Sequence, residues 1–412
     1  MSVTIADIWA AARTIEGHVV RTPAIRAARL SADLGLDLYL KLENMQTTGS
    51  FKERGAINKL SSLTAEQRRV GVIAMSAGNH AQAVAYHATR MGIPSTVVMP
   101  DFAPLTKIER TEAFGARVVL SGDTLDASAE AAAKIAEEEG LTLVHPYDDE
   151  AVIAGQGTIG LELMDQRPSL EVLVVPIGGG GLISGIALAA KALKPGIEII
   201  GVEAAFYPSM HHAVKGIDAR CGGHTLADGI AVKNPGRLTR PVIEQQVDDI
   251  VLVGEGAIES AIAALAEKQK LVAEGAGAAG VAALLAHPGR FRGRQVGVVV
   301  CGGNLDNRIL AGVLTRGLVR DGRMASLRIQ ITDRPGVLGR IAQVIGESGG
   351  NIIEVHHQRH FQDIPVRNAE IDVLVETRSA TERDALVDRL EAIGFPTRVL
   401  SNQSMYIERP GK

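Results

Sequence analysis

The sequence predicts an α/β protein with parallel β-sheets, followed by a small, separate βαββαβ module. From residue 70 onward, short β-branched runs alternate with alanine-rich stretches of helical periodicity. Strands of four or five apolar residues between helices of ten or more are typical of parallel βαβ units buried on both faces. Near residue 320 the pattern changes to the apolar–polar alternation of half-exposed strands. The length of 412 residues also favours more than one domain.

The first region, residues 1–320, is expected to hold one or two parallel sheets. Its predicted strands are 71–75, 95–99, 117–120, 172–176, 197–202 and 296–300, and its predicted helices are 81–91, 105–114 and 125–139. Thr4 and Asp7 have the pattern of a helix start, which predicts a further helix at the N-terminus.

The second region, residues 325–405, is predicted to be a ferredoxin-like module. Its predicted strands are 326–331, 351–356, 370–376 and 397–400, and its predicted helices are 337–348 and 381–393. The run from Asp333 to Gly336 reads as a turn, and Gly349 with Gly350 ends the first helix. Residues 317–323 are the expected linker between the two regions.

Composition excludes several classes of function. The formal net charge of −4 and the pI near 6.3 give no indication of nucleic acid or an anionic membrane as partner. Two cysteines, Cys221 and Cys301, cannot form a disulfide framework. The N-terminus lacks the pattern of a secretory signal, and the long uncharged run 172–190 is interrupted by Pro176 and four glycines. We therefore expect a cytoplasmic protein.

Lys52 is the first candidate for chemistry. It follows a polar, glycine-containing turn, 46–49, at what reads as a helix start. Most lysines lie on the surface and pair with a neighbouring carboxylate, and Glu53 offers such a partner. However, a turn that supplies hydroxyls and backbone N–H groups suits a lysine that bonds covalently to a carbonyl, which requires a neutral amine.

The run Ser76-Ala77-Gly78-Asn79-His80 lies between a predicted strand end and a predicted helix start, where α/β folds bind ligands. The N-terminus of the following helix would suit a carboxylate. Asn79 could donate to a phenolate oxygen, although Asn79 or Ser76 as a plain helix cap is an equal alternative.

Four consecutive glycines, Gly178, Gly179, Gly180 and Gly181, precede Leu182 and a helix. Their N–H groups can converge on one anion, and because no Gly-Lys-Ser or Gly-Lys-Thr follows, a single phosphate is favoured over a nucleotide. A flexible loop is the alternative. The run 275–280 matches G-x-G-x-x-G, but it follows a charged helix end, so we interpret it as close helix packing.

Cys301 follows the predicted strand 296–300, at the expected binding rim of the sheet, or else it is a small buried apolar residue. A zinc site is not predicted, because no second ligand pair has the right spacing. The potential ligands considered were His211, His212, Cys221 and His224.

Six motifs, in this order, resemble the fold type II pyridoxal 5′-phosphate enzymes, and threonine dehydratase (threonine ammonia-lyase) in particular. They are SFKERGA (50–56), SAGNHAQ (76–82), GGGGL (178–182), ADGIAV (227–232), EGAGAAG (274–280) and CGGN (301–304). The resemblance covers nearly the whole chain. The tail DRPGVLGRIAQVIGESGGNI (333–352) resembles an ACT domain, a module that typically binds an amino acid between copies.

The resemblance implies a fold and a cofactor site. It implies two parallel-sheet α/β subdomains, the smaller one about 45–146 inserted in the larger, and pyridoxal 5′-phosphate as cofactor. Lys52 would be bonded to the cofactor, Phe51 would pack on its ring, Asn79 would bind its 3′-oxygen, and Cys301 would face the pyridine nitrogen. The phosphate would be held by Gly178, Gly179, Gly180, Gly181 and Leu182.

The substrate site implied by the resemblance is the run Ser76, Ala77, Gly78, Asn79 and His80. Serine racemases carry a serine at the position of Ala77 as a second base, so we expect elimination without efficient racemisation. Glu203 matches a cation ligand of some relatives, but Tyr207-Pro208-Ser209 lacks the acidic partner, and no metal is expected.

The expected reaction is deamination of L-threonine to 2-oxobutanoate and ammonia, with side activity on L-serine. Open alternatives are a dehydratase for serine or hydroxyaspartate, a serine racemase-like enzyme, and a non-catalytic amino-acid sensor. An effector such as isoleucine or valine is expected near residues 336–338 and Asn351. A homodimer or homotetramer is expected, and isoleucine biosynthesis and threonine degradation both remain open as its setting.

Overall fold

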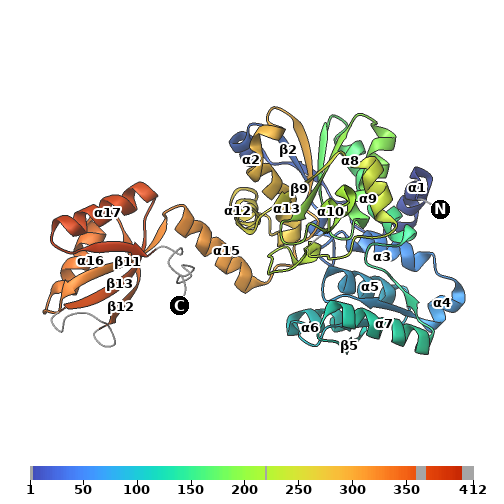
Figure 1. The fold of residues 1–412 in the computed structure, drawn as a ribbon, viewed down its shortest axis with the longest axis horizontal. Helices are drawn as coiled ribbons and strands as arrows, with labels where there is room; N and C mark the ends of the chain where they lie inside the picture. Colours follow the sequence, from blue (N-terminus) through green and yellow to red (C-terminus); the bar gives the residue numbers. More distant parts are fainter. Residues whose placement is uncertain (1–2, 219, 359–367, 401–412) are drawn as a thin grey trace. The chain divides into compact units, whose positions relative to one another are not determined.

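The protein divides into two compact units in a computed structural model, Met1–Asp306 and Asn307–Lys412 (Figure 1). The structure describes residues 3–218, 220–358 and 368–400. The predicted module 325–405 therefore extends past the described residues at 401–405. Each unit is described by itself.

The larger sheet of the first unit has the strand order β1-β2-β10-β7-β8-β9. Its strands are β1 (Ala24–Arg26), β2 (Asp37–Lys41), β7 (Val172–Pro176), β8 (Glu198–Ala204), β9 (Asp249–Val253) and β10 (Gln295–Val299). Only the edge pair β1–β2 is antiparallel among these described strands. Every residue of β7 is buried, as expected for a strand covered on both faces.

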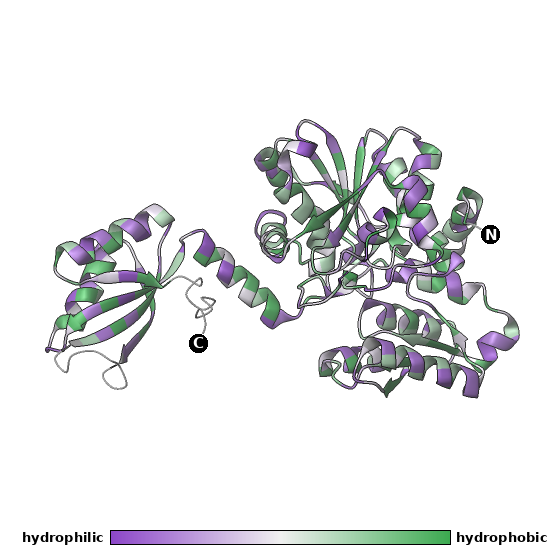
Figure 2. Cartoon of the chain, in the orientation of Figure 1, coloured by the Kyte–Doolittle hydropathy of each residue, from purple (hydrophilic) through white to green (hydrophobic). Residues whose placement is uncertain are grey.

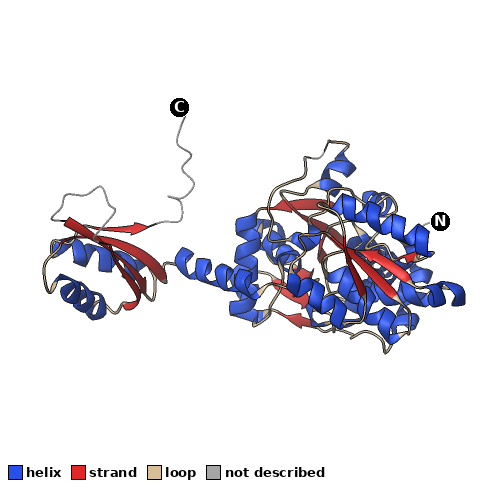
Figure 3. Ribbon diagram, turned by 90° about the horizontal axis from the view of Figure 1, so that it is seen from below, coloured by secondary structure: helices blue, strands red, loops and turns tan. Residues whose placement is uncertain are grey.

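The smaller sheet has the strand order β5-β4-β3-β6, with all described pairs parallel. Its strands are β3 (Val72–Met75), β4 (Ser95–Met99), β5 (Arg117–Leu120) and β6 (Thr142–Leu143). They all lie between β2 and β7 in the sequence, so the chain leaves the larger sheet to build the smaller one and then returns. Figure 3 shows the strands of this unit flanked by helices.

Helices connect these strands. Those of the first unit are α1 (Ile5–Ile15), α2 (Ala28–Leu34), η1 (Glu43–Met45), α3 (Lys52–Ser61), α4 (Ala65–Val70), α5 (Asn79–Arg90), α6 (Leu105–Ala113), α7 (Leu125–Glu139), α8 (Glu150–Gln166), α9 (Gly181–Leu193), α10 (Ser209–Lys215), η2 (Asp228–Ile230), α11 (Thr239–Gln246), α12 (Glu255–Ala264), η3 (Leu265–Gln269), α13 (Gly275–Ala286) and α14 (Pro288–Phe291). Thr4 and Asp7 form a capping box at the start of α1, as their spacing predicts. No helix in the described part of the chain is long and apolar enough to cross a membrane.

The glycine-rich helix α13 packs as closely as its composition predicts. A Cβ added at Gly275 would lie 2.1 Å from the Leu226 carbonyl oxygen, and one at Gly277 would lie 2.2 Å from that of Gly302. The preceding segment is the π-helix η3 and not a strand. The match of 275–280 to G-x-G-x-x-G thus reflects helix packing, as predicted.

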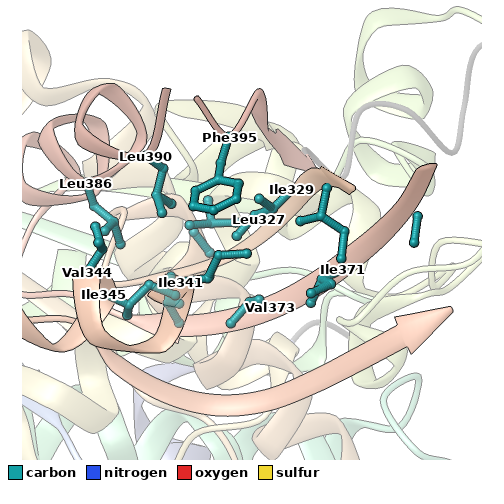
Figure 4. Close-up of a cluster of buried hydrophobic side chains, with 14 residues drawn as sticks. Leu327, Ile329, Ile341, Val344, Ile345, Ile371, Val373, Leu386, Leu390 and Phe395 are labelled. Atoms are coloured by element: carbon teal, nitrogen blue, oxygen red, sulfur yellow. The ribbon is translucent and has the colours of Figure 1, made fainter. Parts of the chain in front are cut away.

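The second unit begins with α15 (Asn307–Arg320) and continues as an antiparallel sheet with the order β12-β13-β11-β14. Its other elements are β11 (Met324–Thr332), α16 (Val337–Glu347), β12 (Asn351–Gln358), β13 (Asn368–Glu376), α17 (Ala380–Ala392) and β14 (Thr397–Leu400). Leu327, Ile371, Ile345, Leu386 and Phe395 belong to its buried core between helices and sheet (Figure 4).

The linker predicted at 317–323 is wrong over most of its length. Helix α15 runs through Arg320, and the units divide between Asp306 and Asn307. The reason is that α15 contacts β11 and so belongs to the second unit.

The alternation of purple and green along the strands of this unit in Figure 2 is the pattern from which its strands were predicted.

Candidate active site

Three of the four predicted site segments lie at the starts of helices. Helix α3 begins at Lys52, α5 begins at Asn79 and α9 begins at Gly181. The segment after β10 contains Cys301 and contacts the segments of Lys52 and Asn79: the Phe51 N–H donates to the Cys301 carbonyl at 3.0 Å, and Ser50 pairs with Gly302. A Cβ at Gly302 would lie 3.1 Å from the Asn79 Nδ2, so residues far apart in sequence meet here.

The amine of Lys52 is sheltered. Its Nζ donates to the Pro146 carbonyl at 2.7 Å and lies 5.1 Å from the centre of the Phe51 ring. Burial lowers the pKa of Lys52 to about 8, against the opposing effects of Cys301 and Glu274. A substantial neutral fraction is therefore present near neutral pH, as a nucleophilic or proton-accepting lysine requires.

The amide of Asn79 is held from both sides. Its Nδ2 donates to the Glu274 Oε1 at 2.6 Å, and its Oδ1 accepts from the Asn304 Nδ2 at 2.8 Å. These contacts fix which way the amide faces and leave the second Nδ2 hydrogen for another acceptor. That geometry suits the expected donation from Asn79 to a phenolate oxygen.

Glu274 and Asn304 were not singled out from the sequence, although both lie in the quoted motifs. Glu274 is buried, and burial raises its pKa to about 7. Its backbone N–H donates to the Gly302 carbonyl at 3.1 Å, which brings the start of α13 to the segment after β10. The signal that could have found Glu274 is a carboxylate directly before a run of small residues that pack closely.

The glycine loop forms a cradle at the start of α9. Gly180 has φ +95°, which favours glycine, and a Cβ at Gly179 would lie 2.2 Å from the Tyr147 ring. The Thr239 Oγ1 donates to the Gly179 carbonyl at 2.6 Å and holds the loop. The first N–H groups of α9, from Gly181 and Leu182, have no intrahelical acceptor and remain for an anion. The cradle fits a single phosphate.

Helix α5 begins at Asn79 with Gly78 as its N-cap residue and no side-chain cap, so the alternative of Asn79 or Ser76 as a plain helix cap is wrong. The Ser76 Oγ accepts from the Gly78 N–H at 3.1 Å, and space around Gly78 is open. His80 is different, because its Nε2 lies 2.7 Å from the Val144 carbonyl and must carry the proton. Burial lowers the pKa of His80 to about 3, so the ring is neutral. The His80 side chain thus holds Val144, which lies just before Pro146, and the Pro146 carbonyl accepts from Lys52. His80 would contact a substrate through its backbone N–H.

Cys301 is buried, and burial raises the pKa of its thiol. It therefore stays protonated, which agrees with a neutral, weak partner for a ring nitrogen.

Glu203 accepts hydrogen bonds from the protein backbone. Its carboxylate accepts from the Met210 and His211 N–H groups at 2.8 Å each, and burial raises its pKa to about 7. No group of three or more His, Cys, Asp or Glu residues among the described residues is placed to hold a metal ion.

The two parts of the expected effector site lie at opposite ends of the second unit. Gly336 follows Thr332, the last residue of β11, whereas Asn351 pairs with Glu376, which pairs with Met324 at the other end of β11. One site that uses both Gly336 and Asn351 would thus need two copies of the chain. A groove of about 570 Å³ adjoins Gly336 and is lined in part by Arg334, Arg340 and Phe395.

Comparison with known proteins identifies both units. Residues 15–302 match the family model of the pyridoxal-phosphate dependent enzymes, and residues 325–395 match the ACT domain. An L-threonine ammonia-lyase of Thermotoga maritima is 45% identical over 400 residues, which is 97% of this chain and all of that protein. An L-threonine ammonia-lyase of Geobacter sulfurreducens is 44% identical over 385 residues, 93% of this chain and 96% of that protein.

Solved structures with the same fold include more than one activity. A maize serine racemase superposes with a TM-score of 0.72 at 35% identity, covering 78% of this chain and 99% of that one. The processed form of threonine deaminase isoform 2 from Solanum lycopersicum superposes with a TM-score of 0.71 at 35% identity, covering 76% of this chain and 91% of that one.

Proposed function

This chain belongs to the pyridoxal-phosphate dependent enzyme family, as a lyase that also carries an ACT domain, and from that premise we propose that it deaminates L-threonine to 2-oxobutanoate and ammonia. The observation that carries the proposal is the convergence of Lys52, the doubly held amide of Asn79 and the glycine cradle in one site. Its substrate is proposed from relatives named L-threonine ammonia-lyase.

The residues present fit pyridoxal 5′-phosphate. Glycines 178–181 and Leu182 would hold the phosphate, Lys52 would bond to the aldehyde carbon, and Phe51 would pack on the ring. Asn79 would donate to the 3′-oxygen and Cys301 would face the ring nitrogen. When bound, the cofactor supplies the electron sink that stabilises negative charge on the substrate's α-carbon.

The protein's own groups then divide the remaining work. The neutral amine of Lys52 accepts the α-proton, and the Pro146 carbonyl, 2.7 Å from Nζ, orients that amine. The backbone N–H groups at the start of α5 bind the substrate carboxylate, helped by the helix dipole. Loss of the β-hydroxyl as water, followed by hydrolysis of the released enamine, gives 2-oxobutanoate and ammonia.

Serine is the expected secondary substrate. It lacks one methyl group of threonine, and such a difference changes transition-state binding by only about 1–3 kcal/mol. Ala77 argues against a racemase, although serine racemases share the fold, because alanine offers no second base. Hydroxyaspartate remains the main alternative substrate.

A substrate panel tests this proposal. Holoenzyme is assayed for 2-oxo acid release from L-threonine, L-serine and L-threo-3-hydroxyaspartate, and kcat/KM is compared. We expect the highest value for threonine and a smaller one for serine. A higher value for hydroxyaspartate would overturn the substrate and leave the cofactor assignment in place. A visible absorbance band that Lys52→Ala loses would exclude a non-catalytic sensor.

The ACT domain is proposed to regulate the enzyme through a branched-chain amino acid, isoleucine or valine, bound between copies in a homodimer or homotetramer. The separation of Gly336 from Asn351 within one copy supports a site shared by two. Activity, thermal midpoint and sedimentation are measured with each amino acid. If neither amino acid changes activity or the midpoint, the effector proposal fails.

A further inference from the structure

Glu53 and His87 form a buried pair between helix α3, which begins at Lys52, and helix α5, which begins at Asn79. Glu53 is the residue after Lys52 in α3, and His87 lies two turns after Asn79 in α5. The exposed fraction of Glu53 is 0% and that of His87 is 1%, and the Glu53 Oε2 lies 3.4 Å from the His87 Nε2. Neither this oxygen nor the ring nitrogens of His87 has a hydrogen-bond partner within the described residues.

The other carboxylate oxygen of Glu53 begins a chain of hydrogen bonds that ends at Asn79 in the candidate active site. Its Oε1 accepts the Thr48 N–H, and the Thr48 carbonyl accepts from the Asn304 Nδ2 at 2.7 Å. The same Asn304 Nδ2 donates to the Asn79 Oδ1 at 2.8 Å. The backbone of Thr48 is thus held at its N–H by Glu53 and at its carbonyl by Asn304, the residue that also orients Asn79.

Burying a carboxylate costs free energy unless the carboxylate is paired, and burying an imidazole without a partner is also unfavourable. The 3.4 Å approach of the Glu53 Oε2 to the His87 Nε2 brings the two buried polar groups together without satisfying the hydrogen-bonding capacity of either. Stability alone does not explain why the pair is polar, because well-packed apolar residues of similar size often replace a buried ion pair at no loss. What an apolar pair could not supply is an acceptor for the Thr48 N–H.

We infer that Glu53, supported by His87, is a positioning residue that fixes the turn 48–50 and, through Asn304, the amide of Asn79. The inference rests on the proposed function and deepens it. The turn leads directly into Lys52, so the pair sets the geometry of the lysine and of the donor to the cofactor's 3′-oxygen together. Small misplacements of such groups reduce rates by large factors.

Two matched double variants separate positioning from stability. In Glu53→Leu with His87→Leu, the charge and the acceptor are both removed. In Glu53→Gln with His87→Leu, the charge is removed but the Gln oxygen can still accept the Thr48 N–H. Four quantities are measured on holoenzyme: the thermal midpoint, the visible absorption maximum of the bound cofactor, its dissociation constant, and kcat with L-threonine.

We expect the Leu/Leu variant to fold with a thermal midpoint below that of the wild type, because the buried Thr48 N–H is left without an acceptor. Its cofactor absorption should shift, because the 3′-oxygen loses a well-placed donor, and its kcat should fall roughly ten- to hundredfold. The Gln/Leu variant should recover the wild-type absorption and most of kcat. If the Leu/Leu variant does not fold, Glu53→Met with His87→Leu replaces it, because methionine adapts more easily to the space. The same results are then expected.

An unchanged absorption maximum and kcat in the folded Leu/Leu variant would overturn the inference. An equal loss in both double variants would also overturn it, because the acceptor would then not matter. Failure of the proposed function is seen separately: wild-type holoenzyme would release no 2-oxobutanoate, while the absorption and dissociation constants would still decide the role of the pair.

Discussion

The side-chain amide of Asn79 donates to the buried carboxyl of Glu274 at 2.6 Å, across 195 positions of sequence. This contact joins the start of α5, which follows β3 of the smaller sheet, to the start of α13, which precedes β10 of the larger sheet. Because Asn304 holds the opposite side of the same amide, Asn79 cannot rotate without breaking a hydrogen bond to one of them. The orientation of the Asn79 amide is therefore set by the protein's own contacts.

Glu274 makes stability depend on pH in a defined direction. Burial raises its pKa from 4.5 to about 7, so the folded state binds its proton over a range in which the unfolded state has lost it. Stability from this group is fully present below pH 4.5 and is lost as pH rises to about 7, by up to about 3 kcal/mol. Glu274→Gln should remove that slope, so urea unfolding of the apoprotein should show the variant gaining on the wild type between pH 5 and 8. A constant difference would contradict the assignment.

Lys52 should react with the cofactor at an unusually low pH for a lysine. Its pKa is lowered to about 8 by burial, so the neutral amine increases as pH rises through about 8 and not through 10.5. The initial rate at which apoprotein develops the visible band after addition of pyridoxal 5′-phosphate reports this titration. A midpoint near 10.5 would show that the amine is not sheltered.

Alanine substitutions at two neighbouring glycines, Gly178 and Gly179, test the glycine cradle. A Cβ at Gly179 would lie 2.2 Å from the Tyr147 ring, whereas one at Gly178 would lie 3.2 Å from the Val232 side chain. We expect Gly179→Ala to weaken cofactor binding by about tenfold or more, since about 1.4 kcal/mol corresponds to tenfold. Gly178→Ala should cause a smaller loss. Equilibrium dialysis measures both, with thermal midpoints as the control for folding, and equal dissociation constants would count against the cradle.

Ala77 should limit racemisation. A proton returned to the α-carbon on the face opposite Lys52 needs a second group, and alanine provides none. Ala77→Ser should raise D-serine formation from L-serine by about tenfold or more. Chiral chromatography of the reaction mixture measures it, with the wild type and Lys52→Ala as controls. If Ala77→Ser forms no more D-serine than the wild type, position 77 does not decide between the two reactions.

Local signals predicted most of the fold. Strand β5, helix α7 and strand β14 occur at the predicted bounds. Helix α7, for example, is marked by Thr124 as its N-cap and Gly140 in the left-handed region at its end. The linker prediction was wrong because α15 is helical through Arg320, and its contact with β11 assigns it to the second unit.

The helix starts that carry the proposed site residues were predictable from a local pattern. Lys52, Asn79 and the four glycines each stand at a helix start, a position that sequence spacing reveals. Glu274 was not predicted from the sequence because its contact with Asn79 is created by the tertiary fold. The separation of Gly336 from Asn351 was also not predictable from the sequence. It depends on strand order and register, which place the two residues near opposite ends of β11.

The most direct test is the release of 2-oxobutanoate from L-threonine by holoenzyme, compared with Lys52→Ala prepared in the same way. The account predicts steady release of 2-oxobutanoate with equimolar ammonia by the wild type. Lys52→Ala should lose both this release and the visible absorbance band of the bound cofactor. Wild-type holoenzyme that shows the band but forms no 2-oxobutanoate would contradict the proposed reaction, and release by Lys52→Ala at the wild-type rate would contradict the role of Lys52.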